Sequence, residues 1–259
     1  MSFTPSQRFV PSRIIGHRGA RAEAPENTLG GFAHLQSLNI HKVELDVHLS
    51  KDKQLIVIHD TTLDRTTNAT GLISALNQAE FATINAAAKF DQPWPHEPVP
   101  TLKAVTQNWA ALEHIQIEVK PLPNPQPRHD AAQALHRFLA RSHLNGLISV
   151  ITSSDPDFLQ ESMHVNNVPH GLVADSDKPK PLELCLSLGA QLLVLHYLLY
   201  TDELAKRCAA KQMPVSLWTV NNPTLAHELI DRGADSIITD CPSAMLASLL
   251  SATDHKIDS

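Results

Sequence analysis

The chain has 259 residues, of which 42% are hydrophobic, and its formal net charge is −6 at pH 7. This length fits one large α/β domain or two small ones, and the apolar content is ample for a buried core. No block of lysine or arginine stands out, which argues against nucleic acid or an anionic membrane surface as the main partner. A locally positive site could still bind an anionic substrate.

The three cysteines are Cys185, Cys208 and Cys241. They are odd in number and lack C-x-x-C spacing, which argues against a disulfide framework or a zinc site and is typical of reduced cysteines in the cytoplasm. The first residues show no pattern of a secretory signal, and the longest apolar run, Leu192 to Tyr200, is too short to span a bilayer. We therefore expect a cytoplasmic protein without a membrane anchor.

Short apolar runs alternate with helical patterns from Ile14 onward, which predicts parallel β/α units. Strands are expected over residues 13–17, 42–49, 55–59, 115–120, 147–152, 171–174, 191–195, 214–220 and 236–239. Helices are expected over residues 28–38, 131–141, 182–188, 202–211, 223–232 and 243–250. Eight such units in about 250 residues fit the size of a (β/α)8 TIM barrel.

The competing fold is an open doubly wound sheet. However, the first strand–helix turn, GHRGARAEAPEN, is no dinucleotide-binding fingerprint, and ionisable residues end several strands rather than gathering at one switch point. Both observations favour the barrel. Residues 61–100 fit neither a strand nor a crossover helix, so we interpret them as a small insertion within a single domain of residues 1–259. The proline-rich residues 121–127 are predicted to form a stiff, extended loop.

Three carboxylates are predicted to point into the mouth of the barrel. Polar and apolar residues alternate in KVELDVHL, so Glu44 and Asp46 share one face of a strand, and in IEVK Glu118 and Lys120 do the same. A lone Glu-x-Asp pair is usually a solvated strand edge, but burying three carboxylates together is costly unless a cation lies between them. Oxygen ligands suit Mg²⁺ or Ca²⁺ better than zinc. We therefore expect Glu44, Asp46 and Glu118 to bind one divalent cation and to leave room for a phosphate.

Two histidines and two basic residues complete the predicted site. His17 and His59 end neighbouring strands, and across a bound phosphodiester one would act as general base and the other as general acid. Arg18 offers a planar fork for phosphate oxygens, and Lys120 adds positive charge where the transition state accumulates negative charge. Trp218, on the alternating strand SLWTV, could form an apolar wall for the alcohol group.

Several of these residues also fit a purely structural role. Glu26 and Asn27 either begin a helix, because Asn is a good N-cap, or place their side chains in the site. Arg65 is interpreted as a scaffold ion-pair residue rather than a catalyst. Arg18 also fits an ion pair with a carboxylate, and Trp218 also fits plain core packing. Most of the fifteen histidines must be structural.

The segments HRGARAEAPENT, VELDVHLSKDKQLIVIHDTTLDRTTNATG, IEVK and LWTVNNPTLAHELIDRGADSIITD, in this order, closely resemble the glycerophosphodiester phosphodiesterases over residues 14–242. The resemblance implies a (β/α)8 barrel with a small insertion after the second strand region, one divalent cation, and hydrolysis of glycerophosphodiesters to sn-glycerol 3-phosphate and an alcohol. By motif position, the paired histidines fall on His17 and His59, the metal carboxylates on Glu44, Asp46 and Glu118, and the substrate-binding residues on Arg18, Glu26, Lys120 and Trp218.

The chain departs from the family pattern in three places. Asp52-Lys53 stands where the family often has Asp-Gly, which changes a turn. Ser153-Ser154 stands where the family often has Ser-Phe, which alters the expected shape of the alcohol pocket and leaves the substrate preference open. The proline-rich loop after Lys120 is longer and stiffer than usual.

Two other functions stay open at this point. A phospholipase-D-type activity on lysophospholipids would use the same site, but it needs an exposed apolar rim, and no such stretch is evident near the strand ends. A non-catalytic barrel that binds a phosphorylated ligand or a partner predicts loss of a chemical residue, and none is lost. A purely structural barrel leaves the three carboxylates unexplained. The sequence does not determine the head group, the choice between Mg²⁺ and Ca²⁺, the attacking oxygen, the identity of the base or the oligomeric state.

Overall fold

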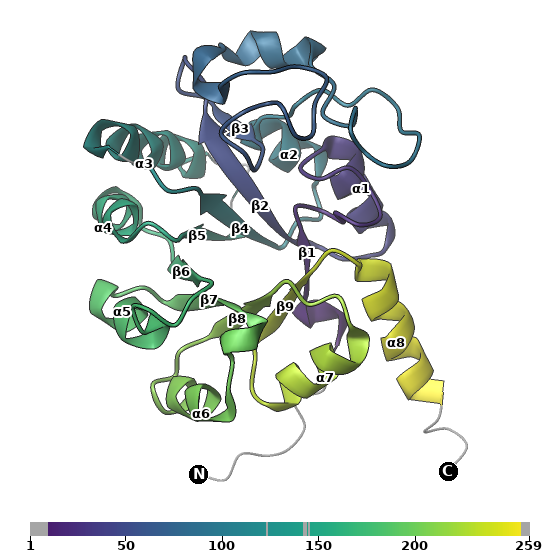
Figure 1. Cartoon of the computed structure of the whole chain (residues 1–259), viewed down its shortest axis with the longest axis vertical. Helices are drawn as coiled ribbons and strands as arrows, with labels where there is room; N and C mark the ends of the chain where they lie inside the picture. Colours follow the sequence, from purple (N-terminus) through teal and green to yellow (C-terminus); the bar gives the residue numbers. More distant parts are fainter. Residues whose placement is uncertain (1–9, 123, 142–143, 145, 255–259) are drawn as a thin grey trace.

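The computed structural model describes residues 10–122, 124–141, 144 and 146–254. Within these residues the parallel strands are β1 (Ile14–His17), β2 (Lys42–Leu49), β4 (His114–Val119), β5 (Ile148–Ser153), β6 (His170–Ala174), β7 (Leu192–His196), β8 (Val215–Trp218) and β9 (Ser236–Thr239). They pair in chain order, and β1 pairs with both β2 and β9, so the sheet closes on itself. This closure confirms the predicted (β/α)8 barrel and excludes the open sheet (Figure 1).

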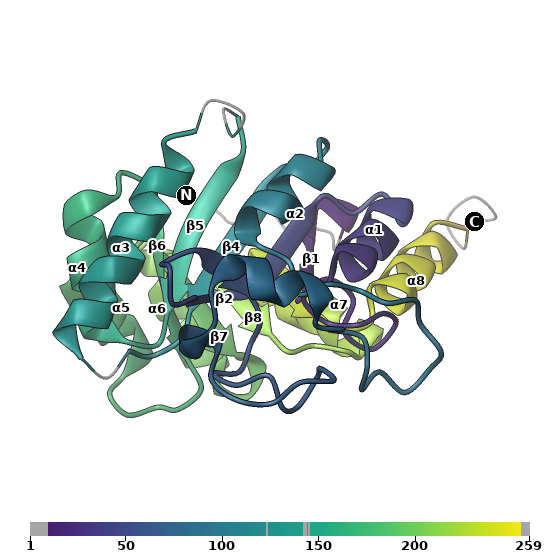
Figure 2. The same ribbon diagram turned by 90° about the horizontal axis from the view of Figure 1, so that it is seen from above.

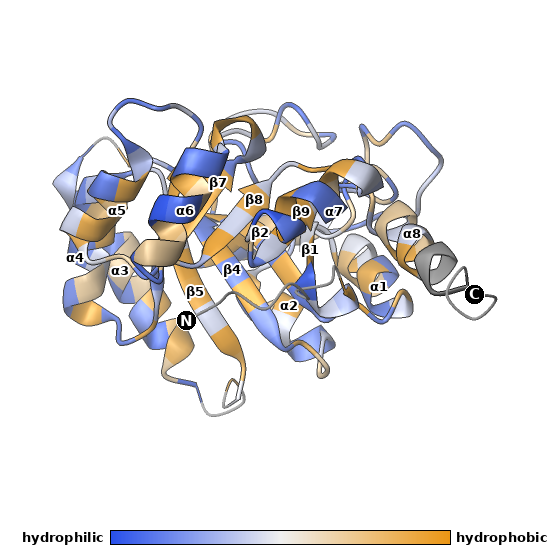
Figure 3. Ribbon diagram, turned by 90° about the horizontal axis from the view of Figure 1, so that it is seen from below, coloured by the Kyte–Doolittle hydropathy of each residue, from blue (hydrophilic) through white to orange (hydrophobic). Residues whose placement is uncertain are grey.

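Helices follow the strands and surround the barrel (Figures 1 and 2). They are α1 (Leu29–Ser37), α2 (Leu102–Asn108), α3 (Pro125–Leu139), α4 (Pro156–Val165), α5 (Pro181–Leu188), α6 (Asp202–Ala210), α7 (Pro223–Asp231) and α8 (Pro242–Asp254). Figure 3 shows polar and apolar residues mixed along these helices, as expected for helices with one face on a core. Within the described part of the chain, no helix has both the length and the apolar character needed to cross a membrane.

The alternation of residues along β2 determines which side chains reach the site. Val43 and Leu45 are fully buried in the main core between the barrel and its helices. Glu44 and Asp46 point to the opposite face and are also buried, with exposed fractions of 4% and 1%. A period-two pattern therefore puts two carboxylates inside the barrel, as the sequence predicted.

Two helices were not predicted, and a third begins earlier than predicted. Thr101 caps α2 by accepting a hydrogen bond from the Ala104 N–H, and Asp155 caps α4 in the same way. Helix α3 begins at Pro125, in the first helical turn, where proline is well tolerated. The prediction of an extended loop over residues 121–127 was therefore wrong from Pro125 onward, and residue 123 lies outside the described residues.

Residues 61–100, the insertion segment, lie beside β2, β3 (Leu55–Val57) and α1 (Figure 1). The segment contains two short 3-10 helices, η2 (Ile73–Ala75) and η3 (Gln78–Thr83). Its apolar side chains form a separate cluster with one face of β3: Ile56, Ile58, Leu63, Ile73, Phe81, Ile84, Ala86 and Val99. The other face of β3 packs in the main core, so this strand lies between the two clusters and contacts both.

Candidate active site

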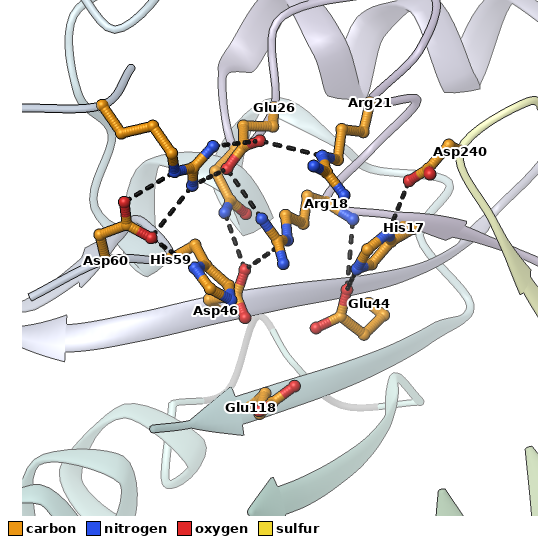
Figure 4. A network of polar contacts seen from close by, with 12 residues as sticks. His17, Arg18, Arg21, Glu26, Glu44, Asp46, His59, Asp60, Glu118 and Asp240 are labelled. Atoms are coloured by element: carbon orange, nitrogen blue, oxygen red, sulfur yellow. Dashed lines mark hydrogen bonds and ion pairs between the residues drawn. The ribbon is translucent and has the colours of Figure 1, made fainter. Parts of the chain in front are cut away.

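The three predicted metal carboxylates meet at the carboxyl ends of β2 and β4. Asp46 and Glu118 are paired in the register of these two strands, and Glu44 lies two residues before Asp46 on the same face. One carboxylate oxygen from each of the three residues lies within 4.8 Å of the other two. Figure 4 shows Glu44 and Asp46 on the same strand, with Glu118 on the neighbouring one.

The charges of this cluster are poorly balanced by the protein itself. Burial and the nearby charges of Asp46 and Glu118 raise the pKa of Glu44 well above its usual value, and burial also raises the pKa of Glu118. Burial opposes the charge on Asp46 as well, but Lys120 and Arg18 hold its pKa below the usual value. Among the residues that the structure describes, Oε1 of Glu44 has no hydrogen-bond partner. A buried set of oxygen donors with a free oxygen fits a hard divalent cation.

Lys120 lies beside the same cluster. Its Nζ is 2.6 Å from Oδ1 of Asp46 and 2.7 Å from Oε1 of Glu118. Burial alone would lower the pKa of Lys120, but these two carboxylates raise it above its usual value. The ammonium group is therefore charged and lies between two of the three carboxylates.

Arg18 approaches Asp46 from the loop after β1. Its Nε is 3.1 Å from Oδ2 of Asp46, and its Nη1 donates to Oε1 of Glu26 at 3.0 Å. The backbone N–H of Arg18 donates to the carbonyl of Glu44, and the residue has a φ of 52°. A left-handed conformation at a residue with a long side chain costs free energy and is often found at functional sites.

His17 at the end of β1 is held by a carboxylate from the far end of the chain. Its Nδ1 is 2.6 Å from Oδ1 of Asp240, which follows β9, and its Nε2 is 3.9 Å from Oε2 of Glu44 (Figure 4). Asn221 donates a hydrogen bond to the other oxygen of Asp240 at 3.0 Å. A carboxylate on Nδ1 leaves Nε2 free to exchange a proton in the site. Asp240 was not among the predicted site residues.

His59 has an equivalent partner. Its Nδ1 is 2.6 Å from Oδ1 of Asp60, and burial lowers the pKa of the imidazole. Burial opposes the charge on Asp60, yet hydrogen bonds from Arg65 and His59 lower its pKa to about 2. Asp60 is also a residue that the prediction missed. Its position next to His59 in the sequence was the available signal.

Residues 26 and 27 both reach the site. Glu26 lies among three arginines, and hydrogen bonds and charge from Arg65 and Arg18 lower its pKa although burial opposes this. Asn27 donates from Nδ2 to Oδ2 of Asp46 at 3.0 Å. The helix that follows is capped by Thr28 rather than by Asn27. Of the two predicted alternatives for residues 26 and 27, the structure therefore shows the one in which their side chains lie in the site.

Trp218 lies at the end of β8, on the same end of the barrel but away from the charged strands. Its ring is perpendicular to that of His196, with centroids 5.4 Å apart, and His196 stacks on Tyr197. The Trp218 indole N–H donates to the carbonyl of Val194 at 3.4 Å. These rings form a partly apolar wall at the ends of β7 and β8.

An apolar pocket of about 450 Å³ adjoins the site between β2, α3 and the insertion segment. Its apolar lining residues include Val47, Leu49, Leu55, Leu72, Val119 and Leu122. Leu72 at its edge is 54% exposed, so the structure has an apolar pocket near the strand ends, where the sequence showed no exposed apolar stretch. His48 connects the pocket to the site, because it lines the pocket and its Nε2 is 2.9 Å from the carbonyl oxygen of His59.

Comparison with known proteins matches residues 17–244 to the model of the glycerophosphoryl diester phosphodiesterase family. A glycerophosphodiester phosphodiesterase of Caldanaerobacter subterraneus subsp. tengcongensis is 29% identical over 239 residues, which cover 90% of this chain and 96% of the relative.

Two solved structures are similar along nearly their whole length. A phosphodiesterase of Oleispira antarctica in complex with the product sn-glycerol-3-phosphate is 25% identical, has a TM-score of 0.85, and the match covers 92% of this chain and 96% of that one. A glycerophosphodiester phosphodiesterase of Thermotoga maritima is 25% identical, with a TM-score of 0.72 and coverage of 92% and 97%. These matches confirm the resemblance and the enzyme class predicted from the sequence. Since the family model covers residues 17–244, which is most of the chain and includes the residues at the mouth of the barrel, the chain belongs to the glycerophosphoryl diester phosphodiesterase family.

Proposed function

We propose that the chain hydrolyses glycerophosphodiesters to sn-glycerol 3-phosphate and an alcohol in a reaction that depends on one divalent cation. The observation that carries this proposal is the cluster of buried Glu44 and Asp46 with half-buried Glu118, beside two histidines that are each hydrogen-bonded to a carboxylate through Nδ1. The relative from Oleispira antarctica, described with sn-glycerol-3-phosphate as its product, supports the product class.

The cation would be held by Glu44, Asp46 and Glu118, whose oxygens suit Mg²⁺ or Ca²⁺. When bound, it supplies positive charge that neutralises the phosphate and the charge that develops in the transition state. Arg18 and Lys120 supply N–H donors to phosphate oxygens from two sides of Asp46.

The two histidines would divide the proton transfers. Nε2 of one histidine takes the proton of the attacking oxygen, and Nε2 of the other gives a proton to the oxygen of the departing alcohol. The attacking oxygen belongs either to water or to the 2-hydroxyl of the glycerol, in which case a cyclic phosphate forms and water opens it in a second step. Either of His17 and His59 fits the role of base. Glu26 would bind the substrate beside Arg18, and Trp218 would contact the alcohol group.

The experiment that tests this proposal measures release of glycerol 3-phosphate from glycerophosphocholine by the purified full-length protein. Activity is expected to vanish with EDTA, to return with Mg²⁺ or Ca²⁺, and to be lost in Glu44→Gln and His17→Gln. Glu203→Gln on the exposed face of α6 is the matched control and should retain activity. Inactivity of the folded, metal-loaded protein on several glycerophosphodiesters would contradict the proposal.

A second candidate is cleavage of lysophospholipids at the same site, because the apolar pocket beside His48 could hold an acyl chain. Cleavage of a lysophospholipid, but of no water-soluble glycerophosphodiester, would favour it.

We further propose that residues 1–259 form a single domain, with residues 61–100 as an insertion. We also propose that the protein is cytoplasmic and acts on a small molecule rather than on nucleic acid. The free state of all three cysteines supports the cytoplasmic setting.

A further inference from the structure

We propose that Arg65, on the insertion segment, is a positioning residue for the reaction: it clamps Asp60 and Glu26 together and thereby fixes the imidazole of His59. The inference rests on the proposed function of the site. It assigns a role in that function to Arg65, which the sequence alone indicated to be a scaffold ion-pair residue.

The guanidinium group of Arg65 contacts two carboxylates with all three of its nitrogens. Nε and Nη2 donate to Oδ2 and Oδ1 of Asp60 at 2.7 and 3.1 Å. Nη1 and Nη2 donate to Oε2 and Oε1 of Glu26 at 3.0 and 2.7 Å. Two-pronged contacts of this kind fix the plane of each carboxylate as well as its distance, which a lysine ammonium cannot do.

The carboxylate held by Arg65 is the one that orients His59. Oδ1 of Asp60 accepts from Nη2 of Arg65 and lies 2.6 Å from Nδ1 of His59. A fixed carboxylate keeps the proton on Nδ1 and the ring in one orientation, so that Nε2 is left for proton transfer. Without Arg65, Asp60 could rotate, and the ring of His59 could turn with it.

The backbone that carries Arg65 is itself well anchored. Leu63 is buried, and its N–H donates to the carbonyl of Gly71 at 2.9 Å. Thr67 donates from both its backbone N–H and its hydroxyl to the carbonyl of Leu63, at 3.1 and 2.8 Å. Arg65 lies within this turn, so its side chain starts from a fixed position.

The alternative is an ordinary surface ion pair, because the side chain of Arg65 is 43% exposed. Exposed ion pairs contribute little to stability, and that alternative predicts little effect of its loss on activity. Arg21 offers a matched control. It is also 43% exposed and its Nε lies 3.2 Å from Oε2 of Glu26, while among the described residues its ion pair is with Glu26 and not with Asp60.

The test compares Arg65→Met, Arg65→Lys and Arg21→Met in the full-length, metal-loaded protein. In Arg65→Met we expect kcat for glycerophosphocholine to fall about 10- to 100-fold, as for other residues that orient an active-site group, with KM changed less than about threefold. Arg65→Lys should recover little of this loss, because an ammonium group cannot form two-pronged hydrogen bonds with both carboxylates. Arg21→Met should stay within about twofold of the wild type.

A second measurement does not need activity. In metal-free protein labelled with ¹⁵N-histidine, two-bond ¹H–¹⁵N correlations show which imidazole nitrogen carries the proton, and the His59 signals are assigned by their loss in His59→Gln. We expect the Nδ1–H form in the wild type and in Arg21→Met, and a mixture of the two forms in Arg65→Met. Unchanged His59 signals in Arg65→Met, or a loss of activity confined to KM, would overturn the inference. An inactive wild type would contradict the proposed function, and the imidazole signals would still decide the role of Arg65.

Discussion

At the scale of single residues, the proposed binding of a cation by the three carboxylates predicts a measurable effect on stability. Glu44 is buried next to Asp46 and Glu118, and its Oε1 lacks a partner among the described residues. Glu44→Gln removes one negative charge from the cluster while keeping the size of the side chain. We therefore expect the metal-free variant to be more stable than the metal-free wild type, by about 1–3 kcal/mol.

Thermal unfolding in EDTA and in excess Ca²⁺ or Mg²⁺ checks this prediction. The wild type should gain stability on addition of the cation, because a ligand that binds only the folded state stabilises it. The variant should gain much less, and exposed Glu203→Gln should behave as the wild type does. An equal gain in Glu44→Gln and the wild type would show that the cation does not bind at this cluster.

The partner of His17 shows where residue patterns stop being informative. His17 and Asp240 are 223 residues apart in the sequence, and no local period connects them. Glu44, Asp46 and Glu118 could be predicted because each lies on a strand whose alternation can be read locally. Asp240 follows a strand end, but only the closed pairing of β1 with β9 brings it to His17.

At the scale of elements, Asp155 holds the start of α4 and also ties it to the preceding β/α unit. Its Oδ1 accepts from the N–H groups of Asp157 and Phe158, and its Oδ2 accepts from Leu122 N–H and Arg128 Nε. Asp155→Ala leaves these donors without their acceptor, and the residue is only 6% exposed. We expect the free energy of unfolding to fall by about 2–4 kcal/mol in urea denaturation.

Asp157 provides the control for this prediction. It lies in the same turn and pairs with Arg128 at 2.9 Å, but its side chain is 68% exposed. Asp157→Ala should change stability by less than about 1 kcal/mol. Similar effects of the two substitutions would mean that Asp155 contributes only a surface charge.

Helix α4, which was not predicted, and the first turn of α3 both carry recognisable helix-start signals. The start of α4 reads Asp155-Pro156, an N-cap followed by proline at the first helical position. The start of α3 reads Asn124-Pro125, but the further proline at position 127 suggested an extended chain. The strands were predicted well because burial of one face imposes a period of two, whereas the starts of α3 and α4 depend on an N-cap residue and proline, which also occur in loops.

At the scale of the whole molecule, the insertion segment and the barrel share β3. Leu55 and Val57 pack in the main core, and Ile56 packs in the cluster of the insertion segment together with buried Phe81. We therefore expect the two parts to unfold together. Phe81→Ala should lower the stability of the whole chain by about 3–5 kcal/mol.

Far-UV circular dichroism follows mainly the barrel, and the fluorescence of a variant that keeps only Trp94 follows the insertion segment. The two urea transitions should coincide, in that variant and after Phe81→Ala is added to it. A separate, earlier fluorescence transition would show that residues 61–100 unfold on their own.

Protonation of His114, at the start of β4, contributes to the pH dependence of the stability of the whole chain. Burial, and then the charge of Lys42, lower its pKa from 6.5 to about 4. The unfolded chain therefore binds a proton more readily than the fold does, so stability falls as the pH drops from about 6.5 to about 4, by up to about 3 kcal/mol. Replacing His114 by Gln should remove this part of the acid destabilisation and leave the pH dependence above pH 7 unchanged.

Urea denaturation at each pH checks this prediction. The control is His136→Gln, at an exposed position on α3, which should follow the wild type. Parallel curves for His114→Gln and the wild type would mean that His114 takes up its proton equally well in the folded and unfolded states.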